Sequence, residues 1–190
     1  MKKIAIFASG YGSNFEAMIE AVRKDELHAE LVLLVSDKPG CRAVECAKKH
    51  QINTWVFYPK NYICKEDFEQ EIVRELRTRG IEWIVLAGYM RLVGKILLNE
   101  YAGRILNIHP SLLPSYPGLH AIERAYANGD KRFGITIHLV DAGMDTGQII
   151  EQHYFDIIGS ESLEEVEKKV HILEHKYYPA VVEKMLSLQT

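Results

Sequence analysis

The sequence predicts an α/β protein built on an open, doubly wound, mostly parallel sheet of the Rossmann-like kind, with an antiparallel edge and a long C-terminal helix. Two observations predict this fold. Short, almost uninterrupted apolar runs alternate with stretches whose apolar residues recur at helical spacing, which is typical of parallel strands covered on both faces. A glycine-rich turn follows the first apolar run, where sheets of this kind bind ligands.

The N-terminal half repeats a strand and helix unit. Strands are expected at four apolar runs, residues 3–8, 31–35, 55–57 and 83–87. Helices are expected between them where apolar residues share one face, over residues 15–22, 43–47 and 68–76. Ser13, followed by Glu16 three residues later, predicts an N-cap and capping box at the first helix.

The pattern changes in the C-terminal half. Strands are expected at 105–108, 135–140 and 148–155, and helices at 121–127 and 162–188. Pro110 ends the first of these strands, and the other two alternate between apolar and polar residues, as antiparallel edge strands do. Pro179 is expected to interrupt the last helix. We find no repeat or linker, so we expect a single domain over residues 1–190.

Composition narrows the possible partners. The chain has 190 residues, 47% of them hydrophobic, and a formal net charge of −3, which argues against a general nucleic-acid-binding surface. No apolar run approaches the roughly 20 residues of a membrane helix. Cys41, Cys46 and Cys64 are odd in number and lack metal-ligand spacing, so we expect reduced thiols in a cytoplasmic protein. Small-molecule partners are therefore expected, and the chain could be a monomer or a homodimer.

The turn Gly10-Tyr11-Gly12-Ser13-Asn14 connects the first strand to the first helix. Glycines let the backbone approach an anion, and the free N–H groups of a helix start favour negative charge. The dinucleotide pattern G-x-G-x-x-G is incomplete, because Phe15 occupies the place of its last glycine. We therefore expect a monophosphate site, with a purely structural turn or a dinucleotide site as the alternatives.

The run Asn107-Ile108-His109-Pro110 predicts a reacting centre. Asn107 and His109 point to the same side of a strand that is about to end, because side chains alternate along a strand. Asp145 lies in a glycine-rich turn after another apolar strand and offers a carboxylate to orient such a histidine. Each residue alone also fits a turn-forming or core role.

Four segments together resemble the phosphoribosylglycinamide formyltransferases, a folate-dependent family. They are residues 7–14 (FASGYGSN), 86–91 (LAGYMR), 107–114 (NIHPSLLP) and 141–147 (DAGMDTG). The resemblance runs the length of the chain. It implies transfer of a formyl group from 10-formyltetrahydrofolate to the amine of N1-(5-phospho-D-ribosyl)glycinamide in purine biosynthesis, without a metal.

The resemblance also implies roles for individual residues. Asn107 would donate a hydrogen bond to the developing oxyanion, His109 would stabilise the same charge or shuttle a proton, and Asp145 would hold His109 in its useful form. The N-terminal half would hold the acceptor, and the C-terminal half would bind folate and carry the catalytic residues. Glu174 would join Gly12, Ser13 and Asn14 in binding the acceptor, and His171 is left open as a phosphate contact.

The folate would contact the other part of the crevice. The residues implied there are Met90, Arg91, Leu92, Val93, Val140 and Asp141, with Lys65 at the glutamate tail. Lysine replaces the bidentate arginine that is frequent at that position, so an exposed lysine without a ligand is the alternative. His138 would lie near the site, in either a core or a supporting role.

Parts of the sequence also fit other functions. His171-Ile172-Leu173-Glu174-His175 matches the H-x-x-E-H zinc motif, but only Glu183 could supply a third ligand downstream, so we expect no metal. A formyltetrahydrofolate hydrolase would need a regulatory domain before Lys3, and a methionyl-tRNA formyltransferase a basic extension after Thr190. A non-catalytic phosphate-ligand-binding module would leave Asn107, His109 and Asp145 without a purpose.

Overall fold

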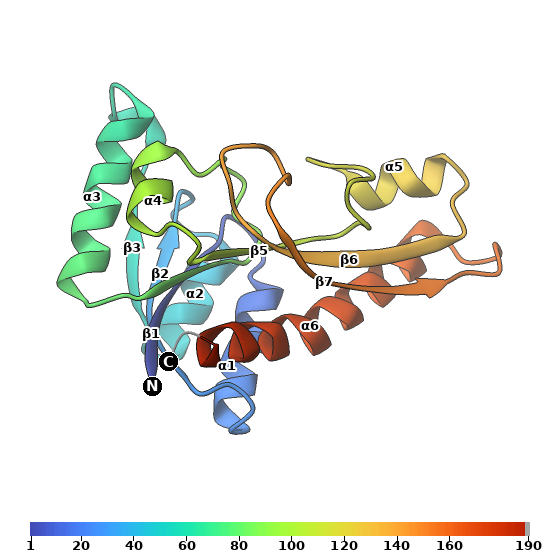
Figure 1. Cartoon of the computed structure of the whole chain (residues 1–190), viewed down its shortest axis with the longest axis horizontal. Coiled ribbons are helices and arrows are strands. Elements are labelled where there is room, and N and C mark those ends of the chain that lie inside the picture. The colour runs from blue at the N-terminus through green and yellow to red at the C-terminus, as the bar shows by residue number, and fades with distance from the viewer. Residues whose placement is uncertain (189–190) are drawn as a thin grey trace.

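The computed structural model describes residues 1–188, which form a seven-stranded sheet with helices on both faces (Figure 1). The strand order is β3-β2-β1-β4-β5-β6-β7. The first five strands run parallel, whereas β6 is antiparallel to β5 and β7 is antiparallel to β6. The predicted fold class, including the antiparallel edge, is therefore confirmed.

The elements follow the expected order. The strands are β1 (Lys2–Phe7), β2 (Ala29–Ser36), β3 (Asn53–Val56), β4 (Trp83–Leu86), β5 (Ile105–His109), β6 (Arg132–Leu139) and β7 (Ile149–Asp156). The helices are α1 (Ser13–Arg23), α2 (Arg42–Lys49), α3 (Lys65–Thr78), α4 (Lys95–Glu100), α5 (Ala121–Ala127) and α6 (Leu163–Ser187), with a 3-10 turn η1 (Pro59–Asn61). The six-residue α4 was not expected, because it is too short to show a helical period.

Alternation along the strands divides the core into two layers. Ile4 and Ile6 of β1 belong to the cluster that packs under α1, α2, α5 and α6. Ala5 and Phe7 belong to the cluster under α3 and α4. Figure 1 shows α3 on one side of the strands and α1 and α2 on the other. Both faces of the parallel strands are thus buried, as their nearly continuous apolar runs predicted.

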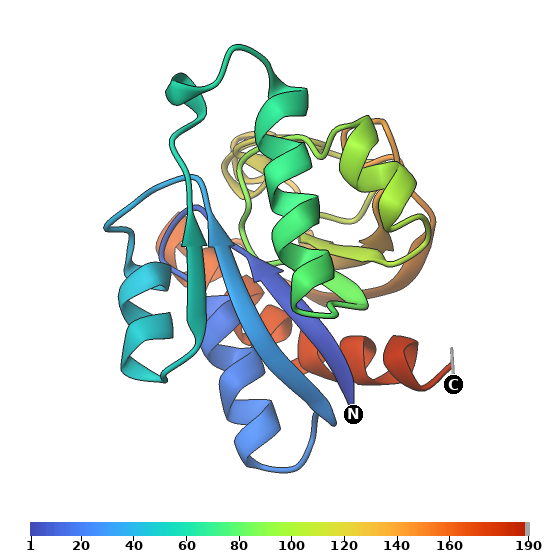
Figure 2. The same cartoon turned by 90° about the vertical axis from the view of Figure 1, so that its left-hand side faces the viewer.

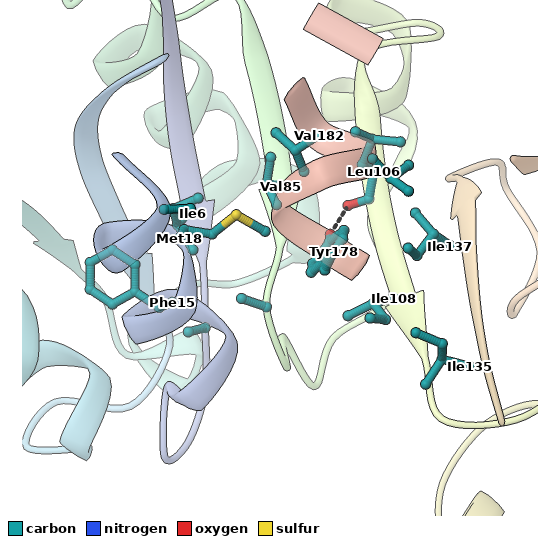
Figure 3. Packing of buried hydrophobic residues seen from close by; sticks show 14 of the residues in the cluster. Ile6, Phe15, Met18, Val85, Leu106, Ile108, Ile135, Ile137, Tyr178 and Val182 are labelled. Carbon is teal, nitrogen blue, oxygen red and sulfur yellow. Dashed lines mark hydrogen bonds between the residues drawn. The ribbon is translucent and has the colours of Figure 1, made fainter. Parts of the chain in front are cut away.

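Helix α6 is continuous through Pro179, so the predicted interruption is wrong. The side chain of Tyr178 is fully buried, and its hydroxyl donates to the carbonyl oxygen of Leu86 at the end of β4 (2.8 Å). The same hydroxyl contacts the carbonyl oxygen of Leu106 in β5 (3.2 Å), as Figure 3 shows. Val181 and Val182 are buried in the next turn. This packing holds the helix against the sheet and offsets the backbone hydrogen bond that proline cannot make.

The sheet directs several chain segments to one edge. Strands β1, β4 and β5 are parallel neighbours, so their carboxyl ends at Phe7, Leu86 and His109 lie along the same edge. The strands β2 and β3 are added on one side of β1, whereas β4 and the strands after it are added on the other side. Such a reversal opens a crevice at the strand ends. Figure 2 shows the last turns of α6 near the start of β1, at the opposite end of this sheet.

Within residues 1–188, no helix combines the length and the apolar character that crossing a bilayer requires.

Candidate active site

One cavity of about 610 Å³ occupies the carboxyl edge of the sheet. It is lined by four of the segments that the sequence singled out and by two residues of α6. These are residues 10–14, 86–93, 107–110, and 138, 140, 141 and 143–145, together with His171 and Glu174. Residues 118–123, which precede and begin α5, complete the wall. The predicted site residues therefore lie around one cavity, with Lys65 as the exception.

The glycine turn presents unpaired backbone amides to this cavity. Gly12 has a φ of 77° and is itself the N-cap of α1, so the predicted Ser13 capping box is wrong. The amide of Glu16 bonds to the carbonyl oxygen of Gly12 (2.9 Å), and no hydrogen bond within the described residues engages the amides of Ser13 and Asn14. Two free N–H groups at a helix start are suited to an anion such as phosphate.

Gly12 is also fixed by steric contact. A Cβ atom added there would lie 2.8 Å from the Cβ of Ala43, because α2 begins directly behind the turn. The amide of Ala43 donates to the carbonyl oxygen of Gly10 (3.1 Å). Both the left-handed backbone and this close approach require glycine at position 12.

Glu174 reaches the same turn from α6. Its carboxylate accepts hydrogen bonds from the amide nitrogen of Asn14 (3.2 Å) and from Nδ1 of His171 (2.8 Å). The carboxylate raises the pKa of His171, which favours a cationic ring beside the glycine turn. The side-chain oxygen of Asn14 is buried without a partner among the described residues. An unpaired buried acceptor marks a place where a ligand can donate a hydrogen bond.

Asn107, His109 and Asp145 meet at the centre of the cavity. Oδ2 of Asp145 lies 3.3 Å from Nδ1 of His109, and Oδ1 accepts a hydrogen bond from Nδ2 of Asn107 at 3.3 Å. Nε2 of His109 is 2.8 Å from the carbonyl oxygen of Tyr116. Because acceptors face both ring nitrogens, only a doubly protonated ring donates to both. The amide of Gly118 completes the shell of Asp145 at 2.8 Å.

His138 supports Asn107 from behind. It is buried, and its Nδ1 donates to the carbonyl oxygen of Leu139 (2.8 Å), so in the neutral ring Nε2 is an acceptor. This Nε2 lies 3.1 Å from Nδ2 of Asn107 and 3.5 Å from Oδ1 of Asp145. Both N–H groups of the Asn107 amide thus have an acceptor in the free site.

The electrostatics of Asp145 favour its ionised form. Burial alone would raise the pKa of this carboxyl group, but the nearby ring of His138, the hydrogen bond from the Gly118 amide and the nearby His109 lower it overall. A negative charge is therefore maintained at the centre of the cavity, where it stabilises a cationic imidazole. A buried amide and a charged imidazole together can stabilise an oxyanion and move a proton.

The segment 90–93 forms the other wall of the cavity. The amide of Met90 donates to Oγ of Ser9 (2.9 Å), and Nε of Arg91 donates to the buried carboxylate of Asp37 (2.8 Å). Leu92 and Met90 are exposed, whereas Val93 is buried in the core under α3 and α4.

The loop that follows β6 closes the same part of the cavity. The amide of Val140 donates to the carbonyl oxygen of Ile105, the first residue of β5 (2.9 Å). Asp141 organises its own turn by accepting from the Gly143 amide (3.0 Å) and the Thr146 hydroxyl (2.7 Å).

Lys65 does not line the cavity. It begins α3, and its charge acts on the buried carboxylate of Glu69, which accepts from the Gly94 amide at 2.5 Å. Burial raises the pKa of Glu69, and the Gly94 amide and Lys65 counteract that rise. The structure therefore gives Lys65 a neighbour in the protein, whereas the sequence suggested a ligand.

The H-x-x-E-H segment is organised around Glu174 and the glycine turn. The rings of His171 and His175 are stacked with centroids 6.2 Å apart, and Glu174 faces Asn14. In residues 1–188 no group of three or more His, Cys, Asp or Glu side chains is arranged to hold a metal ion.

The sequence did not single out Ser9, Asp37, Tyr116 or Gly118 as contributors to the site. Ser9 and Asp37 hold the 90–93 wall, and Tyr116 and Gly118 contact His109 and Asp145 through backbone groups. Contacts made by backbone groups cannot be recognised from residue types in the sequence, although Pro117-Gly118 does indicate a turn.

Known proteins match this chain along nearly its whole length. The family model "Formyl transferase" matches residues 2–182. A curated phosphoribosylglycinamide formyltransferase from Bacillus subtilis is 49% identical over 188 residues, covering 99% of this chain and 96% of that protein. The crystal structure of phosphoribosylglycinamide formyltransferase from Bacillus halodurans superimposes with a TM-score of 0.96 at 50% identity, covering 100% of this chain and 97% of the other.

A longer relative contains the same unit. The Drosophila melanogaster trifunctional purine biosynthetic protein adenosine-3 is 38% identical over 180 residues, and the match spans only 13% of that protein. The B. subtilis and B. halodurans proteins, in contrast, match along nearly their entire lengths. The chain therefore belongs to the formyl transferase family and, within it, to the phosphoribosylglycinamide formyltransferases.

Proposed function

We propose that the chain transfers the formyl group of 10-formyltetrahydrofolate to the amine of N1-(5-phospho-D-ribosyl)glycinamide in de novo purine biosynthesis. The products are N2-formyl-N1-(5-phospho-D-ribosyl)glycinamide and tetrahydrofolate. One observation carries the proposal: the Asn107, His109 and Asp145 cluster lies in the same cavity as an anion-binding helix start and a largely apolar wall. The names of the relatives agree with this reaction.

The acceptor is assigned to the glycine turn. The free amides of Ser13 and Asn14 bind its phosphate, and the left-handed Gly12 brings the backbone close to the phosphate oxygens. Glu174 lies at hydrogen-bonding distance from this turn and accepts from the acceptor's glycinamide end. His171 adds a positive charge on the phosphate side, because its bond to Glu174 stabilises the imidazolium.

The formyl donor is assigned to the opposite wall. The backbone of residues 90–93 pairs with the polar edge of the pterin, and Val93 and Val140 supply apolar surface. Asp141 closes the wall as part of a turn held by its own side chain. Lys65 is kept as a contact of the glutamate tail in this proposal, although its charge also acts on Glu69.

The chemistry places charge where the cluster can stabilise it. The neutral amine attacks the formyl carbon, a C–N bond forms, and the carbonyl electrons move onto oxygen. Asn107 donates to this oxygen, and the imidazolium of His109 stabilises it, which is worth roughly a hundredfold to a thousandfold for a well-placed donor. The amine then loses a proton, and the oxyanion re-forms the carbonyl as the bond to N10 of the folate breaks. The bonding electrons pass to N10, which receives a proton.

Asp145 supports this sequence because its carboxylate lies 3.3 Å from Nδ1 of His109, where it attracts positive charge that develops on the ring. His138 acts on the same cluster, since its Nε2 fixes the orientation of the Asn107 amide. In the free site, the N–H groups of Asn107 and His109 face acceptors of the protein. Each N–H group that binds the substrate must therefore first break its hydrogen bond to the protein.

The expected biological setting belongs to the same proposal. The three cysteines are free thiols, in keeping with a reducing cytoplasm, and the partners are small molecules. Whether the chain acts as a monomer or a homodimer stays a prediction.

The test is to mix the purified protein with 10-formyltetrahydrofolate and to follow tetrahydrofolate release with and without the glycinamide ribonucleotide. Release that depends on the ribonucleotide supports the transferase. Release without any amine supports a formyltetrahydrofolate hydrolase, in which water is the acceptor. No release, together with retained binding of the ribonucleotide, supports a phosphate-ligand-binding module.

A further inference from the structure

Ser9 joins the two substrate walls from a buried position. It follows β1 and directly precedes the glycine turn, and only 1% of its surface is exposed. Its amide donates to the carbonyl oxygen of Gly88 (3.0 Å), and its hydroxyl accepts from the Met90 amide (2.9 Å). The hydroxyl proton goes to Oδ1 of Asp37 (2.6 Å). The Ser9 hydroxyl thus both donates and accepts a hydrogen bond within the protein.

Asp37 extends this contact to a third segment. It follows β2, its side chain is 4% exposed, and its Oδ2 accepts from Nε of Arg91 at 2.8 Å. The carboxylate therefore binds Ser9 with one oxygen and Arg91 with the other. A buried carboxylate is retained only where such partners satisfy it. Neither Ser9 nor Asp37 lines the cavity, so neither can touch a substrate there.

The segment between Gly88 and Gly94 has little other support. It belongs to no helix or strand, and Met90 and Leu92 expose about half of their surfaces. Within the described residues its backbone amides are held at two points, Met90 by Ser9 and Gly94 by Glu69. Removing one of these points frees the end of the segment that lies nearest the glycine turn.

We propose that Ser9 and Asp37 are positioning residues for the formyl donor, which fix the backbone of residues 90–93 at a set distance from the acceptor turn. The proposal rests on the assignment of this wall to the formyl donor. It goes beyond that assignment because the affinity for the donor then depends on two residues that do not line the cavity. Acceptor binding depends on the amides of Ser13 and Asn14, which the network does not contact.

The test compares Ser9→Ala, Asp37→Asn and the double variant. Ser9→Ala removes both hydroxyl bonds, so we expect the KM for 10-formyltetrahydrofolate to rise roughly tenfold. Asp37→Asn keeps one oxygen for two donors, and a smaller rise is expected. The double variant should resemble Ser9→Ala, because both residues act through one network. The KM for the glycinamide ribonucleotide and kcat should stay within about twofold in each case.

Ser36→Ala is the matched control. Ser36 is fully buried at the end of β2, next to Asp37, but among the residues that the structure describes its hydroxyl forms hydrogen bonds only with Lys38 and Cys41. This variant removes a buried hydroxyl from the same region and should leave both KM values unchanged. Thermal unfolding of all variants separates a loss of stability from a change in donor binding.

Calorimetric titration with tetrahydrofolate separates this proposal from the proposed function. Wild-type turnover with unchanged donor KM and tetrahydrofolate affinity in Ser9→Ala would overturn the positioning role alone. Equal increases in both KM values would also overturn it, since the network would then support the site as a whole. If the wild-type protein shows no transfer but binds tetrahydrofolate tenfold more tightly than Ser9→Ala, the positioning role stands and the reaction is wrong.

Discussion

Replacing Asp145 by asparagine tests the reacting centre most directly. Oδ1 of Asp145 accepts from Asn107, and Oδ2 accepts from the Gly118 amide at 2.8 Å and lies 3.3 Å from His109. An asparagine keeps one oxygen, so its NH2 group faces a donor whichever way the amide is turned. The substitution also removes the charge that stabilises the imidazolium of His109.

The size of the effect follows from the distance between the charges. Two unit charges 3.3 Å apart attract by about 5 kcal/mol at an effective dielectric constant of 20. Solvation of the separated groups offsets part of this attraction, and about 3–4 kcal/mol remains for a preorganised site of this kind. We therefore expect kcat to fall roughly a hundredfold to a thousandfold, with both KM values little changed.

The assay is steady-state tetrahydrofolate release at saturating concentrations of both substrates, with tetrahydrofolate affinity measured in parallel. Ser36→Ala serves again as the control for a buried polar substitution outside the cavity. A kcat within threefold of the wild-type value would refute the role assigned to the carboxylate. A large rise in either KM with unchanged kcat would show that Asp145 acts in binding.

Acid unfolding gives an independent check on the same residue. The pKa of Asp145 is lowered in the folded chain, so this group stabilises the fold above its unfolded pKa of about 3.9. That contribution is lost as pH falls through the lower folded value. The stability difference between wild type and Asp145→Asn should thus be constant above about pH 5 and shrink below about pH 4. A difference that grows with acidification would contradict the lowered pKa.

Three further changes test other parts of the site. Gly12→Val forces a β-branched residue into a left-handed backbone against Ala43, so it should cost about 1–3 kcal/mol of unfolding free energy and weaken acceptor binding more than donor binding, as urea unfolding and the two KM values will show. His171→Gln should remove the pH dependence of the acceptor KM. In the wild-type chain this KM should rise above about pH 6.5 as the ring loses its proton, with the bond to Glu174 moving the rise to higher pH. EDTA should leave turnover unchanged, and inhibition that zinc reverses would revive the H-x-x-E-H interpretation.

The sequence predicted the parts of this fold that depend on local patterns. Apolar runs located the five parallel strands within a few residues, because buried parallel strands leave a continuous apolar signal. Apolar–polar alternation located β6 and β7 equally well. The period of two on β5 correctly placed Asn107 and His109 together in the cavity wall. Their pairing with Asp145 depended on the resemblance to a family, since a carboxylate 36 residues beyond His109 carries no local mark.

The errors and omissions share a different cause. Ser13 and Glu16 satisfy the pattern of a capping box, but the turn ends one residue earlier, because left-handed Gly12 can itself precede the helix. Pro179 satisfies the pattern of a helix break, but Tyr178, Val181 and Val182 hold that part of α6 on the sheet. In both places tertiary contact outweighs the local preference, and only the folded chain contains that contact.

The free site pairs each catalytic donor with an acceptor of the protein. Nδ2 of Asn107 faces Asp145 and His138, and the ring of His109 faces Asp145 and the Tyr116 carbonyl. Such pairing keeps buried polar groups satisfied before substrate binds. It also means that the formyl oxygen and the amine must replace existing partners. For His109, the contact to Tyr116 is the one that can be exchanged without losing the carboxylate, because it comes from a loop outside β5 and β6. Substrate binding therefore has to separate the Tyr116 carbonyl from His109 while Asp145 stays in place.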